Sequence, residues 1–292
     1  MVNTSLLAEQ RRIFTCRAGS HAYGLNTETS DEDTRGVFVG LPSNVCGLFP
    51  IEHVEYHGDY MVYELKKFVS LAKDCNPNII ELLYIHPDDI LLSHPLWERL
   101  RENRDLFLTK RAKHTFSGYA VAQLKKIRGH KTWVMNPQPE EPPSPAKFVK
   151  RKYIEGLGQI DVFDQTAYDG ALKHWKQYWE WKENRNPKRA AMEEQSGYDL
   201  KHAMHLIRLL LMGHEILRGE GVLVKRPDRD YLLSIRNGAF AYEDIVEKSD
   251  KLVAELEMLY ETSTLPKAPD VEKIDALLVS IYRDFWRERS EI

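Results

Sequence analysis

The sequence predicts an α+β protein in which a mixed α/β half is followed by a mainly helical half. Short apolar runs bounded by glycine and polar turn residues occupy residues 13–63, which is typical of strands. From about residue 95 onward, apolar residues recur mostly at helical spacing. We therefore expect two domains, residues 1–105 and residues 106–292, a division that the chain length permits.

The composition is that of a globular protein, with 42% hydrophobic and 29% charged residues. A net charge of −3 does not favour nucleic-acid binding over the whole surface, so any such surface should be local. Cys16, Cys46 and Cys75 are scattered without metal-like spacing, which favours reduced thiols and a cytoplasmic protein. No long apolar run is present, so we expect neither a signal peptide nor a membrane span.

Four strands are expected in the first half. Residues 13–18 form the first and end at Gly19-Ser20, and the second runs through residues 37–39. Residues 51–56 and 59–63 flank His57-Gly58 and should form a hairpin. Helices are expected over residues 65–75 and, after a cap at Asn76-Pro77, through Leu83.

The second half contains one clear interruption. Residues 136–146 include five prolines and should form an exposed loop or hinge. Residues 198–217 read as an amphipathic helix. The segment RPDR (residues 226–229) should lead into a short helix that Asp228 caps, and residues 241–285 should form two packing helices.

Asp31 and Asp33 are separated by one residue at the start of the second strand. Alternate residues of a strand point to the same face, so both carboxylates should lie together. Like charges this close repel unless a cation lies between them. Oxygen ligands suit Mg²⁺, with Mn²⁺ as an alternative, and Mg²⁺ commonly also binds substrate phosphates.

Gly19 and Ser20 supply the complementary feature, a phosphate-binding turn. A glycine allows a phosphate to approach the backbone, and the Ser20 hydroxyl adds a donor. Either pattern alone is common, but a phosphate cradle ten residues before a carboxylate pair favours nucleotidyl transfer from a nucleoside triphosphate with two metal ions.

Several segments resemble the polymerase-beta-like nucleotidyltransferase superfamily, in particular a prokaryotic and phage branch associated with RNA repair. They are RAGSHAYGL (17–25), SDEDTRGV (30–37), ELKKF (64–68), Asn76-Pro77, ELL (81–83), YDLKHAMHLIR (198–208) and RPDR (226–229). The resemblance covers most of the chain. It implies a core of a mixed sheet with helices, two catalytic metal ions and a nucleoside triphosphate donor.

The resemblance also implies a third carboxylate on a neighbouring strand. Asp59 opens the second strand of the expected hairpin and is preferred, with Glu64 as the alternative third ligand. Arg17 and Arg35 flank the two motifs, and each could bind phosphate or form a structural ion pair.

A cationic stripe lies on the helix expected at residues 198–217. Lys201, His205 and Arg208 share one narrow arc beside the apolar face. This stripe could bind the triphosphate or pyrophosphate, and ion pairs with acids such as Glu215 are the alternative.

Residues 106–154 are locally basic, with eleven Lys and Arg against two Glu and with aromatic residues interleaved. The bases are Lys110, Arg111, Lys113, Lys125, Lys126, Arg128, Lys131, Lys147, Lys150, Arg151 and Lys152. Such a stretch suits an RNA strand, although the same pattern arises when aromatic residues fill the core and the bases are solvated.

The leading hypothesis is a metal-dependent nucleotidyltransferase that moves a nucleoside monophosphate from a nucleoside triphosphate to a hydroxyl, with an RNA end as acceptor. Transfer to a protein or a small molecule, for example AMP transfer, is an alternative, because a fold does not determine a substrate. A non-catalytic RNA-binding module is a further alternative. No membrane partner is expected.

Overall fold

The computed structural model describes residues 3–28, 30–154, 158–185 and 187–292. The chain forms two compact units. Unit 1 comprises residues 1–124 and 201–292, and unit 2 comprises residues 125–200. The division expected at residue 105 does not coincide with the limits of these units, and it stays a prediction.

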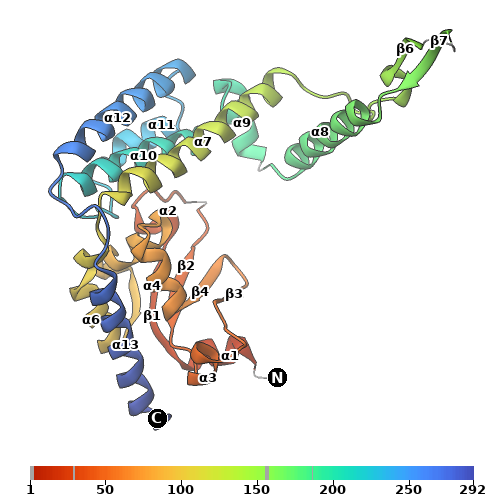
Figure 1. The fold of residues 1–292 in the computed structure, drawn as a ribbon. Coiled ribbons are helices and arrows are strands. Elements are labelled where there is room, and N and C mark those ends of the chain that lie inside the picture. The colour runs from red at the N-terminus through yellow and green to blue at the C-terminus, as the bar shows by residue number, and fades with distance from the viewer. Residues whose placement is uncertain (1–2, 29, 155–157, 186) are drawn as a thin grey trace. The chain divides into compact units, whose positions relative to one another are not determined.

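A five-stranded mixed sheet forms the centre of unit 1 (Figure 1). Its strands are β1 (Arg12–Arg17), β2 (Thr34–Phe38), β3 (His53–Tyr56), β4 (Tyr60–Glu64) and β5 (Ile90–Ser93), in the order β3-β4-β2-β1-β5. β2 and β4 are parallel, and the other neighbours are antiparallel. The predicted α+β class with a mixed sheet is therefore confirmed.

Helices of unit 1 come from both ends of the chain. They are α1 (Thr4–Gln10), α2 (Gly19–Ala22), α3 (Pro42–Cys46), α4 (Leu65–Lys73), α5 (Pro77–Ile80), α6 (Pro95–Glu102), α11 (Arg229–Arg236), α12 (Tyr242–Thr262) and α13 (Val271–Glu288), with the short 3-10 helices η1 (Glu81–Tyr84), η2 (Pro87–Asp89) and η3 (Arg104–Phe107). Two long helices, α7 (Arg111–Met135) and α10 (Leu200–Leu217), continue from one unit into the other.

The core of unit 1 is built where α4, α6 and α13 pack on the sheet and on one another. Phe14 of β1 stacks on Trp97 of α6 with ring centroids 4.0 Å apart, and Phe68 of α4 meets the same indole. Burial of such aromatic side chains supplies most of the favourable free energy of packing. This core fixes the ends of β1, β2 and β4, where the candidate site lies.

Sequence signals placed several helix ends correctly. The Asn76 side chain accepts a hydrogen bond from the Asn78 amide, with Pro77 in the first turn of α5. Asp228 occupies the position before α11, but its side chain does not cap that helix and instead bonds Arg226. The Asp228 carboxylate therefore binds Arg226 instead of the first backbone amides of α11.

Unit 2 contains the end of α7, η4 (Pro145–Phe148), β6 (Val149–Ile154), β7 (Gly158–Phe163), α8 (Gln165–Glu183) and α9 (Pro187–Ser196). β6 and β7 pair as an antiparallel hairpin that the sequence did not predict. The proline-rich segment has neither helix nor strand before η4 begins. Its Pro139 carbonyl accepts hydrogen bonds from the indoles of Trp175 and Trp179, at 2.8 and 3.0 Å.

No helix in the described part of the chain is long and apolar enough to cross a membrane.

Candidate active site

The candidate phosphate-binding turn joins β1 to α2. The Ala18 amide donates a hydrogen bond to the Asp33 carbonyl at 2.9 Å, and Arg17 pairs with Thr34 across the two strands. Gly19 begins α2 and Ser20 follows it. The structure therefore brings Gly19-Ser20 and Asp33 together at one edge of the sheet.

Gly19 is required sterically at this turn. Its φ is +58°, and a Cβ on Gly19 would fall 1.9 Å from Asp33 Oδ2. A side chain at this position would therefore have to displace the carboxylate, in addition to the backbone strain.

Asp31 and Asp33 precede β2, which begins at Thr34. The expectation that strand alternation orients both carboxylates is therefore wrong, because neither residue belongs to the ladder. Asp31 is exposed and Asp33 is half-buried. Contact with Gly19, rather than the strand pleat, places the Asp33 carboxylate.

Asp59 and Glu64 lie at opposite ends of β4. In the parallel pair of β2 and β4, Thr34 pairs with Tyr60 and Phe38 pairs with Glu64. Asp59 directly precedes Tyr60 just as Asp33 precedes Thr34, so these two acids lie at the same sheet edge. Four residues of strand separate Glu64 from that edge, a distance of about 13 Å.

Arg35 holds the backbone of Asp59. Its Nη1 atom donates to the carbonyl oxygens of Thr34, at 2.8 Å, and of Asp59. Asp59 has a φ of +53°, a conformation that side-chain-bearing residues rarely adopt. The bonds of Arg35 therefore go to carbonyl groups and hold the backbone of Asp59, and no ion pair with Asp33 occurs among the described residues. Phosphate binding by Arg35 stays a prediction.

Glu64 is a buried structural group. Its carboxylate accepts hydrogen bonds from the Gly40 amide at 3.1 Å, the Lys66 amide at 2.8 Å and the Tyr282 hydroxyl at 2.5 Å. Burial raises the pKa of Glu64, and these donors partly offset that rise. The residue caps α4 and ties α13 to the sheet.

Three carboxylates at one edge fit a hard divalent cation by their chemistry. Within the described residues, no Lys or Arg side chain bonds to the carboxylates of Asp31, Asp33 or Asp59. Their oxygens do not all lie within 4.8 Å of one another. A metal site formed by Asp31, Asp33 and Asp59 therefore stays a prediction.

Arg17 forms an ion pair at the exposed side of this edge. Its Nε donates to Glu32 at 2.8 Å, and its Nη1 donates to the Asp88 carbonyl at 3.3 Å. Of the two roles considered for Arg17, the structure contains the ion pair.

Arg208 of the cationic stripe of α10 contacts the segment that follows Ser20. Its guanidinium lies 3.7 Å from the centroid of the Tyr23 ring, and the buried Nδ1 atom of His205 has no partner among the described residues. Burial and the nearby charges of Arg208, Lys201, His202 and Arg236 lower the pKa of His205 well below its usual value. Lys201 is exposed. Arg208 is therefore the residue of the stripe that contacts the segment next to the candidate phosphate turn.

Three arginines donate hydrogen bonds to three consecutive backbone carbonyl groups of the loop after α2. The Arg226 amide donates to the Tyr23 carbonyl at 3.0 Å, Arg229 Nε to Gly24 at 2.6 Å, and Arg236 Nη1 to Leu25 at 3.0 Å. The RPDR segment thus positions this loop, a role that sequence reasoning missed. Arginines flanking Pro-Asp were visible, but their backbone acceptors are about 200 residues away in sequence.

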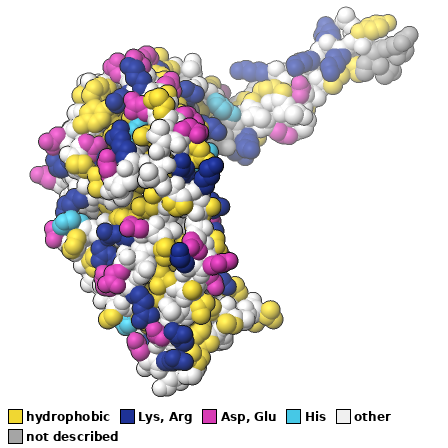
Figure 2. Space-filling model, turned by 60° about the vertical axis from the view of Figure 1, so that its left-hand side comes forward, with side chains coloured by type: hydrophobic (Ala, Val, Ile, Leu, Met, Phe, Trp, Pro, Cys, Tyr) yellow, Lys and Arg dark blue, Asp and Glu magenta, His cyan; other side chains and the backbone are white. Residues whose placement is uncertain are grey.

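Basic residues of unit 2 are largely exposed (Figure 2). Lys125, Lys126 and Arg128 are exposed on α7. In the hairpin, Lys150 pairs with Asp164 and Arg151 with Asp161, and Tyr153 is 75% exposed.

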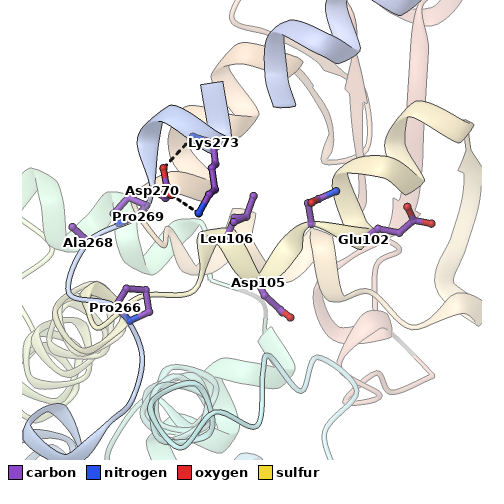
Figure 3. A pocket seen from close by; sticks show the side chains of 9 residues that line it. Glu102, Asp105, Leu106, Pro266, Ala268, Pro269, Asp270 and Lys273 are labelled. Carbon is purple, nitrogen blue, oxygen red and sulfur yellow. Dashed lines mark hydrogen bonds and ion pairs between the residues drawn. The ribbon is translucent and has the colours of Figure 1, made fainter. Parts of the chain in front are cut away.

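An open hollow elsewhere on unit 1 contains none of the candidate site residues (Figure 3). Asp105 lines it, and the Asp270 carboxylate pairs with Lys273 at 2.8 Å within it. Its other lining residues are Glu102, Asn103, Leu106, Pro266, Ala268 and Pro269.

Comparisons with known proteins identify the family of the chain. The chain is 29% identical to an uncharacterized 38.9 kDa protein from the nrdC-mobD intergenic region of Enterobacteria phage T4. That similarity extends over 122 residues, 37% of this chain and 36% of the phage protein, so the match spans about a third of that relative's length. No solved structure matches the chain significantly. The family model described as the RNA repair pathway DNA polymerase beta family matches residues 6–280. Since this match includes both the Gly19-Ser20 turn and the segment that ends at Arg208, the chain belongs to the RNA repair pathway DNA polymerase beta family.

Proposed function

We propose that this protein is a metal-dependent nucleotidyltransferase acting on RNA ends. One observation carries the proposal: the Asp33 carboxylate is packed against Gly19 at the β1–α2 turn, and Asp59 directly precedes the parallel strand β4 at the same end of the sheet. A phosphate held at that turn would lie next to carboxylates able to bind cations. Metal-dependent nucleotidyl transfer requires this proximity of phosphate and metal ions.

Asp31, Asp33 and Asp59 are the proposed metal ligands and catalytic residues. Two Mg²⁺ ions, or Mn²⁺ in their place, would supply activation of the acceptor hydroxyl and neutralisation of phosphate charge. The acceptor oxygen would form a bond to the α-phosphorus while the bond to the bridging oxygen breaks, so that pyrophosphate leaves. Glu64 is not proposed as a ligand, because its carboxylate is buried among structural donors at the other end of β4.

The proposed triphosphate site combines the turn with the cations of α10. Backbone groups at Gly19 and the Ser20 hydroxyl would contact phosphate oxygens, Arg208 and Lys201 would balance their charge, and the neutral His205 ring would contribute a hydrogen bond. Arg208 supports this role best, since its buried guanidinium has few acceptors within the protein. Arg17 could contribute by leaving its exposed pair with Glu32, and Arg35 would act through Asp59.

An RNA acceptor is supported by two observations. The family is described as belonging to an RNA repair pathway. Unit 2 carries 14 Lys and Arg against 11 Asp and Glu, although the whole chain is acidic. A local basic surface would bind a phosphate backbone without making the entire protein a nucleic-acid binder.

The proposal is tested by incubating the protein with each of the four nucleoside triphosphates, labelled at the α-phosphate, together with Mg²⁺ and RNA. We expect label on RNA and release of pyrophosphate. A parallel incubation with cell extract separates the alternatives. Label on a protein band would indicate a protein-modifying enzyme, and RNA binding without transfer of label would indicate a non-catalytic module.

A further inference from the structure

Arg208 and Arg226 are equally buried arginines with opposite surroundings. Each is 5% exposed. Arg226 donates to both carboxylate oxygens of Glu215, at 2.7 and 2.6 Å, and to Asp228 at 2.9 and 3.1 Å. Within the described part of the chain, Arg208 Nη1 donates to the Met212 sulfur at 3.2 Å, and its buried Nε has no acceptor. A guanidinium has five N–H donors, so most of those of Arg208 remain available.

Tyr23 contacts this guanidinium and a buried carboxylate at the same time. Its ring lies against Arg208, and its hydroxyl lies 2.7 and 2.9 Å from the two carboxylate oxygens of Glu81. Glu81 is buried on η1, and no ion pair joins it to Arg208 or to any other cation among the described residues. A buried carboxylate and a buried guanidinium that contact the same side chain would ordinarily form a direct pair.

We propose that Tyr23 is a positioning residue that keeps Arg208 from pairing with Glu81. The phenol satisfies the carboxylate and the ring face supports the guanidinium, so the N–H donors of Arg208 stay free for the triphosphate. This inference rests on the proposed function, since it requires a triphosphate beside the Gly19-Ser20 turn. Tyr23 is held for this task by its own backbone, whose carbonyl accepts from the Arg226 amide.

The key variant is Tyr23→Phe, which retains the ring and removes the hydroxyl. Glu81 then lacks its donor, and Arg208 is the nearest cation able to replace it. We expect the dissociation constant of the tightest-binding nucleoside triphosphate to rise about tenfold. Binding is measured by calorimetry with Ca²⁺ in place of Mg²⁺ to prevent turnover.

Two double variants distinguish the positioning role of Tyr23 from a general disturbance of the fold. Adding Glu81→Gln to Tyr23→Phe removes the competing charge and should restore affinity to within about threefold of the wild type. Adding Tyr23→Phe to Arg208→Lys should cause no further loss. Inorganic tripolyphosphate, used as a competitor, should show the same pattern, because the effect concerns phosphate and not the base.

The chain offers a matched control in Tyr84→Phe. The Tyr84 hydroxyl donates to Asp105 at 3.0 Å, and the Arg104 guanidinium lies 4.5 Å from its ring centroid, beside the hollow of Figure 3. Tyr84 lies on η1 with Glu81, but its hydroxyl bonds Asp105 and not Glu81, so the same chemical change there should leave triphosphate affinity unchanged.

The inference is overturned if Tyr23→Phe binds triphosphate as tightly as the wild type, or if the double variant with Glu81→Gln binds more weakly than Tyr23→Phe alone. If either result is obtained while the wild-type protein binds and transfers nucleotide, the proposed function stands and only the role of Tyr23 is overturned. A wild-type protein that binds no triphosphate would overturn both.

Discussion

Asp33 Oδ2 lies in the space where a side chain on Gly19 would begin, because a Cβ on that glycine would fall 1.9 Å from the carboxylate oxygen. The candidate phosphate turn and a candidate metal ligand are therefore in direct steric contact. A change to either residue should disturb the other.

Gly19→Ala should abolish nucleotidyl transfer, with a loss of at least about a hundredfold in kcat/KM, because displacing a reacting group by about 1 Å has this effect. The positive φ of Gly19 adds about 1 kcal/mol of destabilisation. Steady-state kinetics and thermal unfolding measure the two effects separately.

Gly219→Ala is the control for Gly19→Ala. Gly219 has a φ of +81° and open space around its Cβ position, so it carries the same backbone strain without the clash. Equal losses of activity in the two variants would mean that strain, and not displacement of Asp33, explains the effect.

Asp59→Asn should lose transfer and keep its stability, since the side chain is exposed and belongs to the proposed metal set. Glu64→Ala should show the reverse. It would leave the Gly40 amide, the Lys66 amide and the Tyr282 hydroxyl without their acceptor, and the free energy of unfolding should fall by about 2–4 kcal/mol.

The Asp59→Asn and Glu64→Ala variants are compared by chemical denaturation and by transfer assays at a temperature where both are folded. A folded Glu64→Gln protein without activity, beside an active Asp59→Asn protein, would reverse the assignment of the third carboxylate.

The sequence located this edge because its signals are local. Gly19-Ser20, Asp31 and Asp33 lie within fifteen residues, and their spacing fixes a turn and a following strand. Periodicity likewise located α4 and α10. The contact that orients Asp33 could not be read from spacing, because it depends on the φ of Gly19 and not on strand alternation.

The remainder depends on long-range contacts. Glu64 was the alternative third ligand, and the contact that favours a structural role comes from Tyr282, which is 218 residues away. β6 was missed because successive charged residues obscure the alternation of a strand. The buried link from Tyr23 to Glu81 joins two motifs that the sequence analysis had considered separately.

Neutralising Lys125, Lys126 and Arg128 together with glutamine should weaken RNA binding and flatten its salt dependence. Three lost phosphate contacts would reduce the slope of log K against log salt by about 2 for a single strand. Fluorescence anisotropy with labelled RNA over a range of salt concentrations measures this slope.

A triple variant of Lys248, Lys251 and Lys267 carries the same change in charge at exposed positions of unit 1 and should keep the wild-type slope. If the Lys125, Lys126 and Arg128 variant also keeps it, those residues form only a solvated face.

His205 should make the protein less stable in mild acid. Its pKa in the folded state is well below the usual value, so below about pH 6.5 the unfolded chain binds a proton that the folded chain does not. This group therefore contributes a loss of stability as pH falls from 7.5 to 5.5, of at most about 1.4 kcal/mol per pH unit.

Denaturant unfolding at several pH values measures this dependence. His205→Asn should lessen the slope, and replacing the exposed His57 by Asn should not. If the free energy of unfolding depends on pH equally in the wild type and in His205→Asn, then His205 titrates alike in the folded and unfolded chains.

The central claim is that Asp31 and Asp33 serve nucleotidyl transfer at the Gly19-Ser20 turn. The most direct measurement compares the wild type with the Asp31→Asn, Asp33→Asn double variant, using an α-labelled nucleoside triphosphate, Mg²⁺ and RNA, with circular dichroism to verify folding. We predict label on RNA with the wild type and none with the folded double variant, since each substitution removes a proposed metal ligand. Equal transfer by both proteins, or no transfer by the wild type with any of the four nucleotides, would contradict the account.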